Sequence, residues 1–146
     1  MSTLVFRGFQ ETELRIFEAW FADPLLRKYI LPPTPAWFDY VQSTPGVYAW
    51  MAYNGETPVG YVQVDTAGST AWLVVAVNPW MRRWGYGAAI LNAVCQRPEL
   101  AGLESITAET DCNNSASQRC LLRAGFVKQG DCFSDDSAIQ FIRRLT

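Results

Sequence analysis

Hydrophobic and polar positions follow two periods along the chain, and each change of period marks an expected element. Apolar residues three or four positions apart predict helices at residues 11–21, 24–29, 85–96 and 115–124. Apolar runs rich in β-branched and aromatic residues predict strands at residues 4–9, 47–53, 59–65, 71–77 and 105–111, with two late strands near Phe126 and at 138–143. The resulting order, β-α-α-β-β-β-α-β-α-β-β, predicts a mixed sheet with helices on both faces.

Local turn signals support this division. Asn54 and Gly55 predict a hairpin between two strands, because both residue types tolerate a positive φ. Asp23 followed by Pro24 predicts a helix start, with the carboxylate as N-cap and proline at the first helical position. The sequence Leu-Pro-Pro-Thr-Pro-Ala at residues 31–36 is expected to interrupt regular structure.

Length and charge narrow the class of protein. The chain has 146 residues, and we expect one domain over residues 1–146. The net charge is −2 and the basic residues are scattered, which gives no electrostatic footprint for nucleic acid. No apolar run is long enough for a membrane span or a signal-peptide core, so we expect a cytoplasmic protein without a membrane partner.

The absence of histidine limits the chemistry further. It excludes Ser-His and Cys-His nucleophilic pairs, a histidine base and mixed Cys/His zinc sites, and we expect no metal site. Catalysis would have to use carboxylates, tyrosines, backbone groups or a bound cofactor. The four cysteines are widely spaced and are expected to be reduced thiols with structural roles: Cys95, Cys112, Cys120 and Cys132.

The segment from Val75 to Leu91 carries the strongest chemical signal. An apolar strand leads into Asn-Pro-Trp-Met-Arg-Arg-Trp-Gly-Tyr-Gly and then into a helix. Glycines allow close approach of the backbone, successive N–H groups bind anions, and a helix N-terminus adds partial positive charge. These properties suit a pyrophosphate, and the alternative is that the glycines serve only a tight turn. Neither the Walker pattern nor the dinucleotide-binding pattern matches.

Two motifs, in the expected order, resemble the GNAT family of N-acetyltransferases. The first is Arg82-x-x-Gly85-x-Gly87 after a Val-x-Val-x-Pro strand end, which is similar to the acyl-CoA motif of the family. The second is Asn-x-x-Ser at residues 114–117 followed by Leu-Leu-Arg-Ala-Gly-Phe at 121–126, which is similar to its later Asn, helix and Gly-Phe element. The resemblance covers nearly the whole chain and extends to the branches of ribosomal-protein N-terminal and aminoglycoside 6'-N-acetyltransferases.

The resemblance implies an acetyl-CoA-dependent N-acetyltransferase of α/β class, in the α+β sense. Its fold would be a mixed, mostly antiparallel sheet of about six or seven strands that splay apart at the cofactor site. The residues implied to hold acetyl-CoA are Val75, Val77, Arg82, Arg83, Trp84, Gly85, Tyr86, Gly87, Ala88 and Asn114. The pyrophosphate would lie on the N–H groups of residues 83–88, and the pantetheine arm along residues 75–77. Asn114 and Ser115 have a second interpretation as helix caps, since Ser-x-x-Gln at 115–118 is a capping box.

Transfer to an amine requires a base, because a substrate ammonium must lose a proton first. Glu109 is the first candidate, since it lies mid-strand beside the expected cofactor, and Asp111 on the same face is the alternative. A carboxylate on a strand is also commonly a solvated surface group. The family usually presents a tyrosine four residues before its Gly-Phe pair, and Leu121 stands there in this chain. The customary general acid is therefore missing.

The sequence leaves the acceptor open. We expect direct transfer to a primary amine of a small molecule or a peptide N-terminus, with an aminoglycoside as the alternative within the class. A non-catalytic acyl-CoA-binding sensor and a nucleotide-binding module are alternatives of other classes, and a homodimer stays open. Early aromatic residues would either line the acceptor site or belong to the core: Trp20, Phe21, Tyr29, Trp37, Phe38 and Tyr40.

Overall fold

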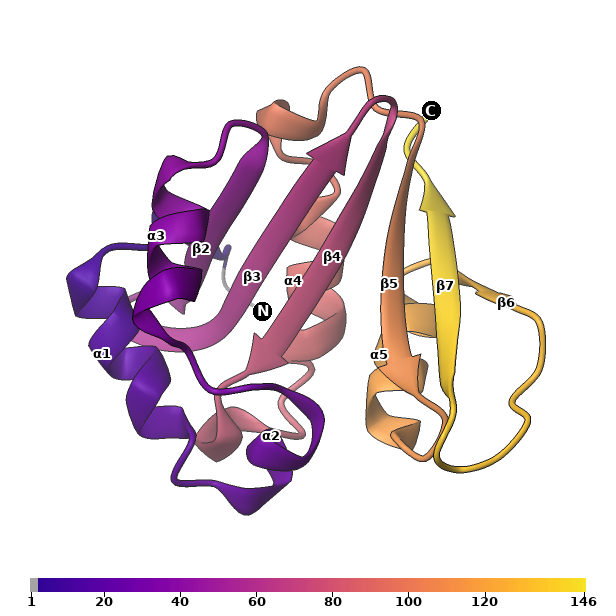
Figure 1. The fold of residues 1–146 in the computed structure, drawn as a ribbon, viewed down its shortest axis with the longest axis horizontal. Coiled ribbons are helices and arrows are strands. Elements are labelled where there is room, and N and C mark those ends of the chain that lie inside the picture. Colours follow the sequence, from indigo (N-terminus) through magenta and orange to yellow (C-terminus); the bar gives the residue numbers. More distant parts are fainter. Residues whose placement is uncertain (1–2) are drawn as a thin grey trace.

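A seven-stranded sheet runs through the protein in the order β1-β2-β3-β4-β5-β7-β6, in a computed structural model that describes residues 3–146 (Figure 1). Only β4 and β5 pair in parallel, and every other neighbouring pair is antiparallel. The strands are β1 (Val5–Gly8), β2 (Val47–Asn54), β3 (Thr57–Ala67), β4 (Thr70–Val77), β5 (Ser105–Asp111), β6 (Val127–Gln129) and β7 (Ala138–Arg144). The expected mixed, mostly antiparallel sheet is confirmed.

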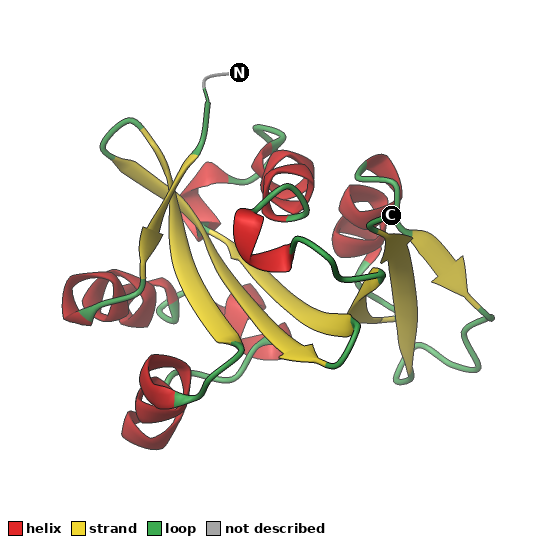
Figure 2. Ribbon diagram, turned by 90° about the horizontal axis from the view of Figure 1, so that it is seen from above, coloured by secondary structure: helices red, strands yellow, loops and turns green. Residues whose placement is uncertain are grey.

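Helices cover both faces of the sheet (Figure 2). One face, which we call the α3 face, carries α1 (Glu11–Trp20), α2 (Pro24–Tyr29) and α3 (Pro35–Ser43). The other, the α4 face, carries α4 (Tyr86–Val94) and α5 (Ser115–Arg123). Short 3-10 turns occupy Pro79–Met81 (η1) and Pro98–Leu100 (η2). Among the described residues, no helix is long and apolar enough to cross a membrane.

Helix α3 corrects the expectation that residues 31–36 only interrupt regular structure. The helix begins inside this proline-rich run, with Pro35 at its first turn. The hydroxyl of Thr34 accepts a hydrogen bond from the Trp37 backbone N–H at 3.1 Å and so caps the helix. A proline at the first position needs no N–H partner, which is why the same residue that breaks a helix interior can start one.

Each face has its own hydrophobic core. On the α4 face, Ile90, Leu91 and Val94 pack against strand residues that include Ile106 and Ala108. The core on the α3 face is aromatic and takes in buried Trp20 and Phe21, with Trp37 and Phe38 packed partly buried against it. Four of the six aromatic residues considered for the acceptor site therefore belong to this core, while Tyr40 is exposed and Tyr29 half-buried.

The cysteines differ from the expectation of four reduced thiols. Cys112, just after β5, forms a disulfide with Cys132 in the loop between β6 and β7. Cys95 and Cys120 are free. The two bonded cysteines are 20 residues apart in sequence, and their pairing follows from the loop before β7 returning to the end of β5.

Candidate functional site

The central strands separate from one another over half of their length. Pairing between β4 and β5 runs only from Thr70 opposite Ser105 to Leu73 opposite Ala108. Beyond that point β4 stays paired with β3 as far as Val77, and β5 stays paired with β7 as far as Asp111. The two strands visibly diverge toward their carboxyl ends (Figure 1). The expected splay is present, and each strand leaves backbone groups on its inner side without a strand partner.

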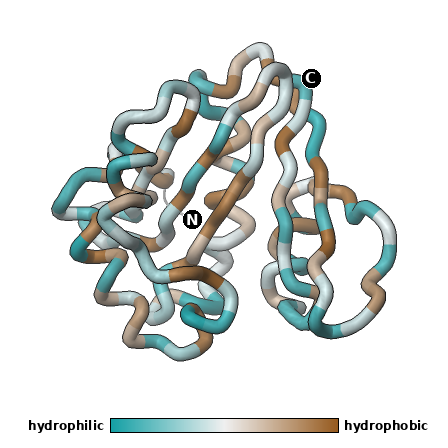
Figure 3. Tube along the Cα trace, in the orientation of Figure 1, coloured by the Kyte–Doolittle hydropathy of each residue, from teal (hydrophilic) through white to brown (hydrophobic). Residues whose placement is uncertain are grey.

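The separated part of β4 is also its most hydrophobic part (Figure 3). Val75 and Val77 are half-buried and pack against the core of the α4 face. An apolar strand edge with free backbone groups suits a ligand arm that combines methylene and amide groups, because both kinds of contact are available side by side.

The loop between β4 and α4 presents a run of free donors. Arg83 and Gly85 both adopt a positive φ, of 67° and 82°. The first hydrogen bond of α4 runs from Ala89 N to Gly85 O at 3.3 Å. Among residues 3–146, no acceptor is paired with the backbone N–H groups of residues 83–88. Six successive free N–H groups at a helix N-terminus offer the kind of donors that bind anions in other proteins.

Gly87 has a reason of its own to be glycine. A Cβ there would lie 2.7 Å from Cys120 Sγ and 3.6 Å from Val77 Cγ2. The first turn of α4 therefore meets the end of β4 and helix α5 at this residue. Gly85 permits the turn, whereas Gly87 permits the close packing of the two helices.

Tyr86 contributes only its backbone to the loop. Its side chain is buried in the core of the α4 face, and its hydroxyl accepts a hydrogen bond from Asn54 Nδ2 at 2.7 Å. This bond ties the hairpin turn between β2 and β3 to the start of α4.

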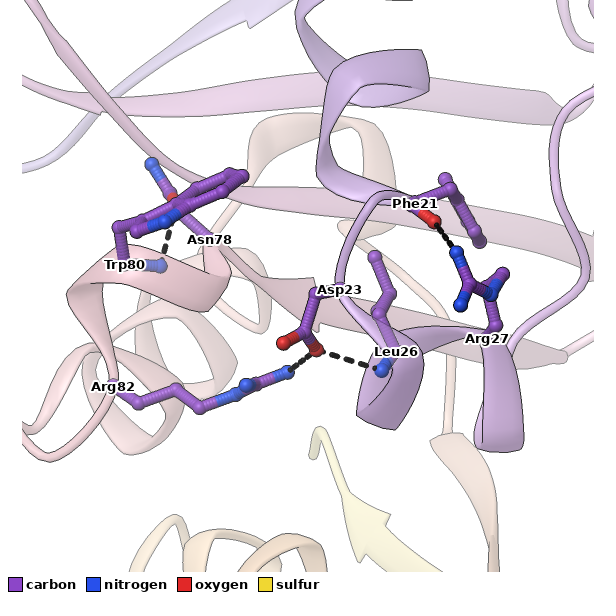
Figure 4. A network of polar contacts seen from close by, with 7 residues as sticks. All are labelled: Phe21, Asp23, Leu26, Arg27, Asn78, Trp80 and Arg82. Atoms are coloured by element: carbon purple, nitrogen blue, oxygen red, sulfur yellow. Dashed lines mark hydrogen bonds and ion pairs between the residues drawn. The ribbon is translucent and has the colours of Figure 1, made fainter.

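The side chain of Arg82 points toward Asp23, at the start of α2 on the α3 face (Figure 4). Its guanidinium forms an ion pair with Asp23 at 2.8 Å. Asp23 also caps α2 by accepting a hydrogen bond from Leu26 N at 2.9 Å. The Arg82 hydrogen bond lowers the pKa of Asp23, with a further contribution from Leu26 N, although partial burial opposes both. Arg83, by contrast, is exposed.

Asn78 is a site residue that sequence reasoning missed. It is 8% exposed, donates from Nδ2 to Pro58 O at 2.8 Å and accepts from Trp80 N at 3.0 Å. Its backbone N–H bonds to Val59 O at 2.9 Å. Asn78 thus anchors the loop to β3 and caps η1. In the sequence, the only feature that indicates this role is its position between a strand and Pro79.

Two exposed tryptophans flank the arginines of the loop. Trp80 is 65% exposed and Trp84 is 66% exposed. Trp84 was among the predicted cofactor residues, and Trp80 was not. Both expose aromatic surface in the segment between β4 and α4.

Asn114 serves as the N-cap of α5. Its Oδ1 accepts a hydrogen bond from Ser117 N at 3.2 Å. The capping interpretation is confirmed for Asn114, while Ser115 is the first helical residue and not the cap. Gln118 donates from Nε2 to Cys112 O at 2.9 Å, so it holds the preceding loop. Among residues 3–146, no hydrogen bond uses the Nδ2 group of Asn114, which stays available as a donor.

Glu109 lies on β5 just past the last residue paired with β4. Ile106 and Ala108 face the α4 core, so Glu109 and Asp111 lie on the α3 face, where no helix covers β5 (Figure 1). Glu109 is exposed and Asp111 half-buried. Among residues 3–146, neither carboxylate takes part in an ion pair. Both are therefore open to an incoming group.

Leu121 is 3% exposed and packs in the core of the α4 face. It supplies no polar atom to the site. The position at which the GNAT family usually has a tyrosine is thus filled by an apolar side chain on α5.

Comparison with known proteins agrees with this geometry. The model of the acetyltransferase (GNAT) family matches residues 13–126. An uncharacterized N-acetyltransferase of Bacillus subtilis (strain 168), YfmK, is 28% identical over 141 residues, which is 95% of either chain. The resemblance inferred from the two motifs is confirmed.

Solved structures share the fold at low identity. The aminoglycoside acetyltransferase AAC(6')-Ib, in complex with coenzyme A and kanamycin, superposes with a TM-score of 0.77 at 19% identity, over 97% of this chain and 95% of that one. The spermidine N-acetyltransferase of Vibrio cholerae, in complex with CoA and spermine, gives a TM-score of 0.80 at 13% identity, over 97% and 95%. At these identities the likeness concerns the fold.

Proposed function

Because the chain belongs to the GNAT family of acetyltransferases, we propose that it moves an acetyl group from acetyl-CoA to a primary amine of a small molecule or of a peptide N-terminus. The observation that carries the proposal is the run of six free backbone N–H groups at residues 83–88, placed where β4 ends and α4 begins. Such a run selects for an anionic group such as a pyrophosphate.

The residues present fit acetyl-CoA. The N–H groups from Arg83 to Ala88 would bind the pyrophosphate, with Arg83 adding formal charge. The separated edge of β4 at Val75 and Val77 would hold the pantetheine arm, and Asn114 would offer its remaining Nδ2 donor. When bound, acetyl-CoA supplies an acetyl group already activated as a thioester. Its thioester carbonyl needs one donor, for which the free backbone edge near Val77 is available.

Arg82 was predicted to bind the cofactor directly, and here it is given a structural role. Its guanidinium is held by Asp23 at 2.8 Å, so its first task is to join the loop to α2. It contributes positive charge near the loop, while Arg83 and the backbone donors make the direct contacts.

Glu109 is the proposed general base. Its exposed carboxylate lies on the open face of the sheet at the point where β4 and β5 part. From there it can accept the proton of an arriving ammonium, directly or through water. Asp111 lies two residues further along the same face and is the alternative base.

Direct transfer is favoured over a covalent enzyme intermediate. Of the two free thiols, burial raises the pKa of Cys95, which lowers its thiolate fraction. Cys120 lies against Gly87 between the two helices. The proposed site has no histidine to activate either thiol.

Calorimetry tests the cofactor, and thiol release tests the reaction. We expect acetyl-CoA to bind more tightly than ATP or NAD; the reverse order would identify a nucleotide-binding module. Thiol release should then be followed with a panel that contains aminoglycosides, polyamines and short peptides. Tight acetyl-CoA binding without turnover on any amine would favour a sensor over an enzyme.

A further inference from the structure

Strand β4 exposes two large apolar side chains beside the point where it separates from β5. Trp72 is 46% exposed and Val74 is 43% exposed. Both alternate with Leu73, which packs in the core of the α4 face, so both point to the α3 face. Val74 and Glu109 are the first residues of their strands beyond the last pair, Leu73 and Ala108. The proposed base therefore has an apolar surface as its neighbour on β4.

A set of polar side chains on β3 borders this apolar surface on its other side. Asp65 is paired with Trp72 in the sheet. Its carboxylate accepts hydrogen bonds from Gln63 Nε2 at 2.8 Å and from the Tyr40 hydroxyl at 2.5 Å. Gln63 in turn accepts a hydrogen bond from Trp37 Nε1 at 3.1 Å, so two bonds tie α3 to β3. These side chains are held in place without a ligand, and binding does not have to order them.

The two carboxylates that flank the apolar surface favour a cation. Among residues 3–146, neither Asp65 nor Glu109 takes part in an ion pair. On strands β3, β4, β5 and β7 of the described chain, one cation, Arg144, faces the same way. It is paired with Ser105, four residues before Glu109. An ammonium ion is attracted to this surface, whereas a carboxylate placed next to an amine at Glu109 would be repelled.

We propose that the acceptor is an arylalkylamine, which is a primary amine joined by a short carbon chain to an aromatic ring, without a carboxylate. This rests on the proposed function, because it places the amine at Glu109 beside the acetyl group. The ring lies on Trp72 and Val74 in this arrangement. Aromatic pairs in stacked or edge-to-face contact are favourable beyond the burial of their area, and an exposed tryptophan beside the reacting groups offers that contact.

The register of the strands sets the length of the chain between ring and amine. Trp72 is paired with Thr107, so Glu109 lies one strand across and two residues further along. At about 4.8 Å between strands and about 3.3 Å per residue, the Cα atoms of Trp72 and Glu109 are roughly 8 Å apart. A chain of two or three carbons spans this distance once the side chains reach toward the ligand. Polyamines and aminoglycosides have no flat apolar group for this surface.

The transfer itself is balanced with this acceptor. The ammonium gives a proton to Glu109, its nitrogen bonds to the acetyl carbon, and the bond from that carbon to sulphur breaks. The electron pair of the broken bond stays on sulphur. The nitrogen then loses a second proton, which ends on the sulphur through water, so the products are the N-acetyl arylalkylamine and coenzyme A.

Initial rates with matched acceptors test the class. We expect kcat/KM for phenethylamine to exceed that for butylamine, which lacks the ring, by at least about tenfold. Phenylalanine, which adds a carboxylate beside the amine, should also be poorer by at least about tenfold. Spermidine and kanamycin should fall below phenethylamine as well. Equal values for phenethylamine and butylamine, or a higher value for spermidine, kanamycin or phenylalanine, would overturn the proposal.

Trp72→Ala separates recognition of the ring from the chemistry. We expect KM for phenethylamine to rise about tenfold, while kcat and KM for acetyl-CoA stay within about twofold and KM for butylamine does not change. Trp72→Phe keeps a ring and should retain most of the preference. Leu122→Ala is the control, since it removes an apolar side chain that is 56% exposed on α5, and it should change none of these values. If Trp72→Ala does not fold, Val74→Ala should raise KM for phenethylamine about threefold.

The outcomes distinguish this inference from the proposed function. If another amine is acetylated and arylalkylamines are not, the acceptor class is wrong although the chain is an acetyltransferase. An unchanged KM for phenethylamine in folded Trp72→Ala would remove Trp72 from the acceptor site. If wild type sediments as a dimer and Trp72→Ala as a monomer, the exposed surface is an interface with a second copy, and the assignment is also wrong. If wild type acetylates no amine of the panel, both proposals fail together.

Discussion

The guanidinium of Arg82 donates a hydrogen bond to the carboxylate of Asp23 over 2.8 Å, although 59 residues separate them in the sequence. Arg82 precedes α4, and Asp23 caps α2 on the opposite face of the sheet. The pair therefore joins the proposed acetyl-CoA loop to the helices that cover the α3 face. A substitution of either residue is therefore expected to affect both the loop before α4 and the helices on the α3 face.

Asp23 has two tasks that substitutions can separate. Asparagine caps a helix about as well as aspartate, so Asp23→Asn removes mainly the ion pair, whereas Asp23→Ala removes the cap as well. We expect Asp23→Ala to lower the free energy of unfolding by about 1 kcal/mol more than Asp23→Asn does. Urea denaturation measures the difference. Asp39→Ala, at an exposed position on α3, is the control, and equal losses for the two Asp23 variants would contradict the capping role.

The same carboxylate predicts a pH dependence. Since the Arg82 hydrogen bond lowers the pKa of Asp23 below its ordinary value of 3.8, its contribution to folding is present above that pH. The contribution is lost as the pH falls through the lowered pKa of the folded state. The difference in unfolding free energy between wild type and Asp23→Asn should be constant near neutral pH and shrink below about pH 4. A difference that grows in acid would contradict this assignment.

Gly87 is predicted to matter for packing. Gly87→Ala places a Cβ 2.7 Å from Cys120 Sγ, so it should destabilise the protein by about 1–3 kcal/mol although alanine favours helices. Cys120→Ala removes the sulphur, and the double variant should regain most of the loss. A double-mutant cycle by urea denaturation measures the coupling, and simple additivity of the two changes would show that the side chains do not meet.

Glu109→Gln tests the proposed base. Because glutamine keeps the shape but cannot take a proton, we expect turnover to fall at least about a hundredfold while the acetyl-CoA affinity stays nearly the same. The acid limb of the pH profile for kcat/KM should be lost or displaced. Glu104→Gln, an exposed carboxylate just before β5, serves as the control. An unchanged rate with an unmoved profile would transfer the role to Asp111 or to water.

Local signals in the sequence predicted most of the fold. Helix α2 and strand β5 have the predicted bounds, because Asp23-Pro24 and the apolar run of β5 are short-range features. Helix α3 was not predicted, because its first residue, Pro35, lies in the proline-rich run 31–36, which is expected to interrupt regular structure. A proline can either end a helix or begin one. Pro35 begins α3 because it directly follows Thr34, whose hydroxyl caps the helix.

The site was predictable where it depends on backbone shape. The positive φ of Gly85 and the free N–H groups after it follow from a glycine before a helix. The ion pair of Asp23 with Arg82 and the contact of Gly87 with Cys120 join residues far apart in the sequence. They depend on how the elements pack, which periodicity does not encode. The disulfide between Cys112 and Cys132 was missed for the same reason.

Acetyl-CoA binding by wild type and Gly85→Glu, measured by calorimetry, tests the central claim most directly. A glutamate would place a bulky anion among the free N–H groups of residues 83–88, and we predict that binding is abolished. Gly102→Glu is the matched control, because Gly102 also has a positive φ, of 87°, and open space around it, but lies outside the loop. Circular dichroism verifies that both variants fold. Loss of binding in Gly85→Glu alone is the predicted result, and wild-type affinity in a folded Gly85→Glu variant would contradict the assignment of this loop to the pyrophosphate.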